Sequence, residues 1–182
     1  MSITPRTMLQ HALSFVVIPL LACGVLACDA APQDTTDAPV LSFDVARIRL
    51  IAGADTNYLH VELAKSSPQQ TLGLMERGHL PDTSGMLFLY QFTQPATAGF
   101  WMFRTKVPLD IAYVDSMGAI VAIKQMVPCT STLAEGCPSY PPEVPYRAAL
   151  EAGAGYFASH KLTLGSRVML GDTSVVVTRA PK

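Results

Sequence analysis

The amino-acid sequence predicts a mostly β fold, either a compact β-sandwich or a partly closed barrel, with one or two short helices. Several short apolar segments alternate with polar residues and are separated by turn-forming residues. Helix signals are confined to two short segments. Many short strands with little helix are typical of sandwiches and barrels. The length of 182 residues and the hydrophobic content of 49% fit one globular domain.

Residues 1–27 are predicted to be a signal peptide rather than part of this fold. Arg6 is the only Lys, Arg, Asp or Glu before Asp29, and residues 12–28 are apolar. A positive start, an apolar core and small residues at its end are typical of secretory signals. A transmembrane anchor is the alternative, but the run is shorter than the roughly 20 residues that a bilayer requires, and Pro19 interrupts it.

The signal ends in "VLAC" at residues 25–28, which resembles the cleavage box of bacterial lipoproteins. This resemblance implies a diacylglyceryl thioether and an acylated amino group on Cys28. "LLAC" makes Cys23 the alternative, but Cys28 leaves a longer apolar core and polar sequence follows it at once. More than one acyl chain gives stable anchoring. We therefore expect an exported protein, held by lipid to the cell envelope and facing the periplasm or the exterior.

Residues 28–40 are predicted to be a flexible tether, and residues 41–182 a single β-rich domain. The tether sequence "DAAPQDTTDAPV" is small, polar, acidic and proline-containing. Such a composition buries too little apolar surface to offset the entropy of ordering the chain. A domain of about 140 residues buries roughly two-thirds of its unfolded surface, so this one needs no metal to fold.

The first part of the domain predicts a hairpin followed by a helix. Residues 41–53 and 57–64 alternate apolar and polar side chains, with "ADTN" as the turn between them. In "SSPQQTLGLMERGHL", Ser67 is predicted to cap a helix and Gln70 to complete a capping box. Gly78 suits the left-handed position at the helix end.

The second part predicts further strands. Apolar runs occupy residues 86–92, 97–103, 109–114 and 119–127, and "DSMG" predicts a hairpin within the last two. "YFASHKL" predicts a short helix, and "RVML" with "SVVVTR" a closing hairpin around "GDT".

Cys129 and Cys137 are predicted to form a disulfide. Outside the cytoplasm, a cysteine pair close in sequence is more often a disulfide than a metal site. Histidine is absent near them, and a zinc site needs three or four ligands. A redox-active pair, which usually has two intervening residues, and free thiols are the alternatives.

The segment "GFWMFRTKVPLDI" places charged residues among apolar ones. Strand alternation puts Asp110 on the same face as Ala112 and Val114, which predicts that it is buried. An unpaired buried charge is costly, so we expect Asp110 to pair with an arginine, Arg77 or Arg104 first.

Glu151, inside "AALEAG", poses the same problem, and three interpretations remain open. The charges could form a buried network that fixes the strand register. They could line a ligand pocket, with Trp101 as an apolar wall, Arg77 or Arg104 binding an anion, and Asp110 or Glu151 binding a hydroxyl group. They could also act in an enzyme, with the two carboxyl groups as acid and base on carbohydrate or peptide.

Other classes of function find little support. A nucleic-acid partner calls for a basic surface, whereas the net charge is −1 and no Lys/Arg-rich run occurs. Neither a Gly-x-Ser-x-Gly elbow nor a histidine pair at ligand spacing is present. The sequence therefore predicts no metal, no cofactor and no assignable catalytic residue.

Three motifs in order, "GLMERGHLPDTSGMLFLY", "FWMFRTKVPLDIAYVD" and "ALEAGAG", resemble the domain-of-unknown-function 192 family of bacteria and archaea. The resemblance spans about Val61 to Val177. It implies a small, often exported, mostly β domain, and it implies no activity because none is established for the family.

Together these observations favour a lipid-anchored extracytoplasmic domain that acts as a binding or accessory module. Its expected partners are the membrane, through the N-terminal lipid, and a small ligand or an envelope protein. An envelope enzyme and a purely structural partner protein are the alternatives.

The first prediction concerns the anchor. Cys28→Ser should release the protein from the membrane or stall its processing, because the acylated thiol is lost. Mass spectrometry of the mature N-terminus measures this directly. Lipid on Cys23 would mean that the other box is used, and two unmodified cysteines would contradict the lipoprotein prediction.

Overall fold

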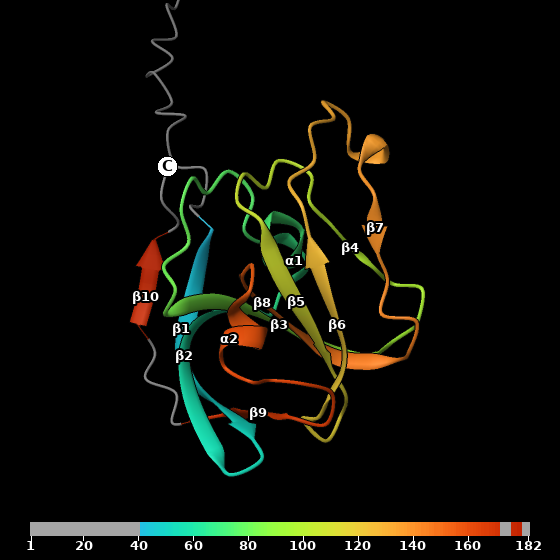
Figure 1. Cartoon of the computed structure of the whole chain (residues 1–182). Helices are drawn as coiled ribbons and strands as arrows, with labels where there is room; N and C mark the ends of the chain where they lie inside the picture. The colour runs from blue at the N-terminus through green and yellow to red at the C-terminus, as the bar shows by residue number, and fades with distance from the viewer. Residues whose placement is uncertain (1–40, 172–175, 180–182) are drawn as a thin grey trace, which may run out of the picture. The chain divides into compact units, whose positions relative to one another are not determined.

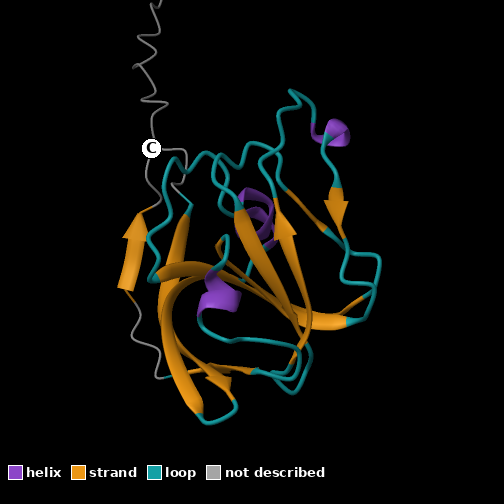
Figure 2. Cartoon of the chain, in the orientation of Figure 1, coloured by secondary structure: helices purple, strands orange, loops and turns teal. Residues whose placement is uncertain are grey.

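The computed structural model describes residues 41–171 and 176–179. The predicted signal peptide and tether, with Cys23 and Cys28, lie outside the described residues. Across the described ranges the chain is mostly β-strand with short helices, which confirms the predicted fold class (Figures 1 and 2). In that part of the chain, no helix has the length and apolar character needed to cross a membrane.

Within the described ranges, eight strands form one sheet with the order β10-β1-β2-β3-β8-β5-β6, and β9 also pairs with β1. The strands are β1 Ser42–Ala52, β2 Asp55–Ala64, β3 Ser84–Gln94, β5 Leu109–Val114, β6 Ile120–Met126, β8 Tyr146–Gly153, β9 Arg167–Leu170 and β10 Val176–Arg179. Two short strands, β4 Phe100–Trp101 and β7 Ser139–Tyr140, form a small second sheet. Figure 1 shows the large sheet curling into a half-barrel.

Two of the three predicted hairpins form. In the first, Ala52 pairs with Asp55, so β1 and β2 are joined by the two residues Gly53 and Ala54. In the second, β5 pairs with β6 across the "DSMG" turn. The Asp115 carboxylate closes this turn by accepting hydrogen bonds from the backbone N–H groups of Met117 and Ala119, each at 2.8 Å.

The predicted helix is α1, Ser67–Leu72, but its ends differ from the prediction. The N-cap is Ser66 rather than Ser67, and the capping box is completed by Gln69 rather than Gln70. The Gln69 side chain also donates to the Ser42 carbonyl at 2.7 Å, and this contact with β1 favours the earlier cap of the two adjacent serines. The helix ends at Gly73, with φ of 48°, well before Gly78.

The predicted closing hairpin is wrong. β9 and β10 do not pair with each other; both run antiparallel to β1, at Ile48–Ile51 and Ser42–Val45 respectively. They therefore act as two parts of one interrupted strand along the free edge of the long strand β1. The run 97–103 also forms less strand than expected, since only Phe100–Trp101 is extended and paired.

The start of β9 closes one end of the half-barrel. Ala119, just before β6, bridges to Arg167. The Ile120 N–H donates to the Ser166 carbonyl, and the Val168 N–H donates to the Gly118 carbonyl, each at 2.8 Å. β6 and β1 are thus connected through β9, which leaves the sheet partly closed.

Two hydrophobic cores lie on opposite faces of the sheet. The first, which we call the α2 core, contains Tyr156 and Phe157 of the short helix α2, Tyr156–Ser159. The second, the α1 core, contains Met86, Phe88 and Ile111 and is packed against Leu72 of α1. β5 contributes to both cores, and all six of its residues are buried.

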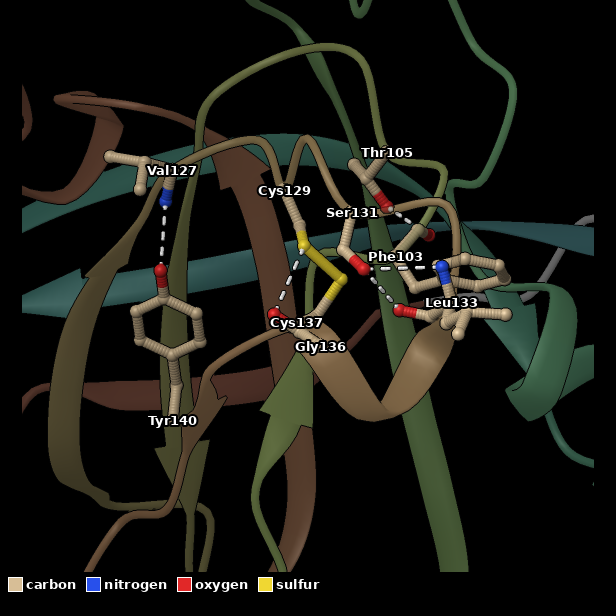
Figure 3. Close-up of a disulfide and its surroundings, with 9 residues drawn as sticks. All are labelled: Phe103, Thr105, Val127, Cys129, Ser131, Leu133, Gly136, Cys137 and Tyr140. Carbon is tan, nitrogen blue, oxygen red and sulfur yellow. Dashed lines mark hydrogen bonds between the residues drawn. A yellow bond between two sulfur atoms is a disulfide. The ribbon is translucent and has the colours of Figure 1, made fainter.

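The structure joins Cys129 and Cys137 by a disulfide, with a Cα–Cα distance of 5.6 Å (Figure 3). The bridge closes the loop that holds the short 3₁₀ helix η1, Ala134–Gly136, and leads into β7. Beyond the loop, the Tyr140 hydroxyl accepts a hydrogen bond from the Val127 N–H at 3.3 Å, so the base of the loop has a second connection.

The second prediction concerns this bridge. Replacing Cys129 and Cys137 together by alanine should lower the free energy of unfolding by about 2.5 kcal/mol or less, the loop-closure entropy for a ring of this size. The domain should still fold, because Cys129 only borders the α1 core and the buried residues of both cores are unchanged. Denaturant melts under non-reducing conditions measure the loss, and an unfolded double variant would contradict the prediction.

Candidate functional site

Asp110 and Glu151 lie on neighbouring strands but on opposite faces of the sheet. Asp110 pairs with Ala152, whereas Ile111 pairs with Glu151. Opposed residues of antiparallel strands share a face, and successive residues alternate between faces. Asp110 therefore lies on the face of the α2 core and Glu151 on the face of the α1 core. The hypothesis that the two carboxyl groups form an acid–base pair is wrong.

Asp110 is buried, with 6% of its surface exposed, as the strand pattern predicts, but its partner is not an arginine. Its Oδ2 accepts a hydrogen bond from the Gly155 N–H at 2.8 Å, at the start of α2. Burial raises the pKa of Asp110, while hydrogen bonds from the backbone of Gly155 and Phe157 oppose that shift. Gly155 has φ of 85°, a conformation that favours glycine, and it is the N-cap residue of α2.

Arg77 pairs with Glu62 instead. Its Nη1 and Nη2 donate to Oε1 and Oε2 of Glu62, both at 2.6 Å, in a bidentate ion pair that is partly buried. Glu62 is opposite Met86, and Met86 is opposite Glu151, so this pair lies on the face that carries Glu151. The predicted pairing of Arg77 with Asp110 fails because the sheet separates them.

Arg104 also has another partner, in an exposed ion-pair cluster. Arg104 and Lys106 both pair with Glu76, and these contacts lower the pKa of Glu76. The Glu76 N–H donates to the Arg104 carbonyl at 2.8 Å. The cluster thereby ties the segment after α1 to the segment after β4, which places Arg104 in a loop contact rather than near Asp110.

Glu151 is the one sequence-predicted site residue that faces a pocket while almost fully buried. Only 4% of its surface is exposed, and no hydrogen bond or ion pair to its side chain occurs within residues 41–171 and 176–179. Burial raises its pKa to about 8, and the positive charge of Arg77 opposes the shift. At neutral pH the carboxyl group is therefore mostly protonated.

The pocket at Glu151 is small, about 30 Å³, which is room for one or two water molecules. It lies between the sheet and the segments that cover the α1 core. Its lining residues are Gln70, Thr71, Leu72, Gly73, Leu74, Met75, Phe88, Phe100, Trp101, Thr105 and Glu151.

Trp101 forms an outer wall of this pocket. It lies in β4, paired with Ser139 of β7, and is 46% exposed. Its ring centroid is 6.4 Å from that of Phe103. Trp101 and Glu151, which are 50 residues apart in the sequence, therefore line one pocket, as the ligand-pocket hypothesis requires.

Tyrosine side chains fill the α1 core beside Glu151. The Tyr146 hydroxyl donates to the Ala98 carbonyl at 2.9 Å, and the Tyr113 hydroxyl donates to the Tyr140 carbonyl. Burial raises the pKa of Tyr113 and of Tyr146 above the ordinary tyrosine value. These groups remain neutral and hold the β4 and β7 segments in place.

A second, open depression of about 460 Å³ lies between β6 and residues 162–164. Lys124 is the charged residue in its lining, and it already pairs with Glu143. In the described part of the chain, no group of three His, Cys, Asp or Glu side chains is arranged to hold a metal ion. The Glu151 pocket is therefore the better candidate site.

Sequence reasoning missed several residues of the site. Glu62 lies on the polar face of its strand, but nothing in the sequence links it to Arg77, 15 residues away. Phe88, Thr105 and the α1 residues join the pocket only because α1 folds back over β3. The sequence contains a signal for the start of α1, but it contains no signal that places this helix over Glu151.

A curled β domain with a buried carboxyl group facing a small pocket is the class of structure that these observations define. The DUF192 family, described as "Uncharacterized ACR", matches residues 49–170. The chain belongs to this family.

Two solved structures are similar. One is a protein from Sinorhizobium meliloti 1021 described as a "putative transcription regulator", with 32% identity, a TM-score of 0.64, and coverage of 71% of this chain and 96% of that one. The other is a protein of unknown function from Novosphingobium aromaticivorans DSM 12444, with 31% identity, a TM-score of 0.61, and coverage of 71% and 88%. No curated protein matches the chain.

The third prediction concerns the ionisation of Glu151. Its pKa is about 8 in the folded protein against 4.5 as the reference value, so between these pH values the folded state holds more protons than the unfolded state. Stability should therefore fall as pH rises through this window, by at most about 1.4 kcal/mol per pH unit.

Glu151→Gln should remove this component, because glutamine does not titrate. Denaturant melts from pH 4 to pH 9 should show the wild type losing stability relative to the variant up to about pH 8 and then holding a constant difference. Asp110 is present in both proteins, so its contribution to the pH dependence cancels in the difference between them. A difference that does not change with pH would contradict the raised pKa.

Proposed function

We propose that this protein is a lipid-anchored extracytoplasmic binding module, and that the Glu151 pocket receives a polar group of its ligand. The observation that carries the proposal is an unpartnered carboxyl group, 4% exposed, at a pocket whose outer wall is Trp101. Burying such a group costs free energy unless it gains a hydrogen-bonding partner. A ligand group in the pocket would supply that partner.

Two features support an extracytoplasmic, lipid-anchored protein. The "VLAC" box and the polar segment after it are typical of lipoproteins. The disulfide between Cys129 and Cys137 fits an oxidising compartment. The anchor would hold the binding domain near the membrane without contributing to the pocket.

The alternatives are less well supported. Catalysis by paired carboxyl groups is disfavoured because Asp110 and Glu151 lie on opposite faces. A role in transcription regulation, the description given to the Sinorhizobium protein, is less well supported, because nucleic-acid binding calls for a basic surface and this chain has a net charge of −1 and no basic run.

The fourth prediction tests the binding site through fluorescence. Trp101 is the only tryptophan in the chain, so its emission reports on the pocket. We expect small compounds that carry a hydroxyl, amide or ammonium group to change this emission saturably when added to the full chain in detergent. Because Glu151 provides the buried contact, Glu151→Gln should weaken such binding at least tenfold.

Glu143→Gln is the matched control, because Glu143 is exposed, lies outside the pocket lining and undergoes the same chemical change. Its affinity should equal that of the wild type. Equal binding by Glu151→Gln, or no response of Trp101 to any member of the panel, would overturn the proposed site.

A further inference from the structure

We infer that the group received by the Glu151 pocket is a primary ammonium group at the end of an unbranched chain. This inference rests on the proposed function, since it takes the same pocket as the binding site and names the chemistry of the ligand. Three properties of the pocket lead to it: a carboxyl group without an ion-pair partner, aromatic residues in the lining beside the end of α1, and a small volume.

The carboxyl group comes first. Glu151 is buried on a face that also carries Met86 and Ile111, its direct neighbours across β3 and β5. No cation of the described chain forms an ion pair with it. An ionised carboxylate at such a position needs both hydrogen bonds and an opposite charge, and an ammonium group supplies both. A hydroxyl group supplies only the hydrogen bonds.

The walls of the pocket favour a cation. Three aromatic residues, Phe88, Phe100 and Trp101, line it, and a cation that reaches the face of such a ring is attracted to it. Gln70 and Thr71, near the end of α1, line it too. The carbonyl groups at the end of a helix carry partial negative charge, and α1 has no basic residue in its last turn to neutralise them.

The cations near the pocket are already paired. Arg77 donates both of its terminal nitrogens to Glu62, at 2.6 Å each. Arg104 and Lys106 share Glu76 at the surface. The positive charge around the pocket is therefore balanced, and the charge that remains to be balanced is that of Glu151 once it ionises.

The volume selects the kind of cation. About 30 Å³ accommodates a group the size of a water molecule, such as –NH₃⁺. A trimethylammonium group or a sugar ring is too large. The remainder of the ligand would lie outside, against the exposed part of Trp101.

Binding should be coupled to the loss of a proton. With a pKa of about 8, the Glu151 carboxyl group is mostly protonated at pH 7. When an ammonium group enters, the carboxyl proton passes to the buffer and an ammonium–carboxylate pair remains. Of the other groups near Glu151, Glu62 and Arg77 stay paired, and the tyrosines Tyr90, Tyr113 and Tyr146 have raised pKa values and stay neutral.

The fifth prediction follows and is tested with n-butylamine, n-butanol and tetramethylammonium on the full chain. Calorimetry in buffers of different ionisation enthalpy should show that butylamine releases most of a proton at pH 7 and a small fraction of one at pH 9. Butanol should bind at least tenfold more weakly and release none, and tetramethylammonium should not compete. The Glu151→Gln variant should bind butylamine at least tenfold more weakly than the wild type does. The Glu143→Gln variant should bind it with the wild-type affinity.

The outcomes separate this inference from the proposed function. If butanol binds as well as butylamine and Glu151→Gln weakens both, the pocket is a binding site but the ammonium inference is overturned. Butylamine binding without proton release overturns it as well. If none of the three probes alters Trp101 emission or produces heat, both proposals fail.

A primary ammonium group occurs in free alkylamines and in lysine side chains. An additional binding measurement distinguishes these two sources. Nα-acetyl-lysine methylamide should bind with the same proton release. Tighter binding than that of butylamine would indicate a protein-borne lysine, and weaker binding a free amine. Equal binding of its Nε-acetylated form, which has no ammonium group, would overturn the inference.

Discussion

The neighbouring strands β5 and β8 are paired along both edges and packed on both faces, and this two-sided burial constrains the rest of the structure. All six residues of β5 are buried, as are residues 149–152 of β8. A polar side chain at these positions has no access to bulk water. It must find hydrogen bonds in the protein, lose its charge, or gain a partner from outside.

Asp110 and Glu151 meet this constraint in different ways. Asp110 is close to the first turn of α2, whose backbone N–H groups stabilise the carboxylate and fix the helix against β5. Glu151 lies on the face of the α1 core, and no hydrogen bond to its carboxyl group occurs among the described residues. The neutral, protonated form of Glu151 is then lower in free energy than the charged form, which is why its pKa is raised. The first carboxyl group is therefore held by backbone hydrogen bonds, whereas no hydrogen bond to the second occurs among the described residues.

The pocket depends on contacts between segments that are distant in the sequence. α1 covers Phe88 because β2 and β3 are parallel and need a crossover connection. The segment after β4 is held over the same face by the bond between Glu76 and Arg104, and by the pairing of β4 with β7. The disulfide and the Tyr113 hydroxyl hold the β7 side. The pocket walls are therefore built from separate parts of the chain that no single motif contains.

Local patterns determined the fold class, the two hairpins, the presence of α1 and α2, and the burial of Asp110. Alternation and turn residues act between neighbours along the chain, so the sequence is sufficient for these features. Alternation alone does not say whether Asp110 and Glu151 share a face of the sheet. That depends on the register of β5 against β8, because a shift of one residue moves every side chain of a strand to the other face.

The tertiary structure determined which charged groups pair with each other and which strands pair with each other. The sequence indicated which charges needed neutralising, but not that Arg77 would reach Glu62, that Arg104 would reach Glu76, or that backbone N–H groups would satisfy Asp110. Likewise, the sequence pattern predicted that β9 and β10 are strands, but it did not predict that both of them pair with β1. Pairing depends on which surfaces meet after the chain has folded, whereas the tendency to be strand, helix or buried depends on the residues themselves.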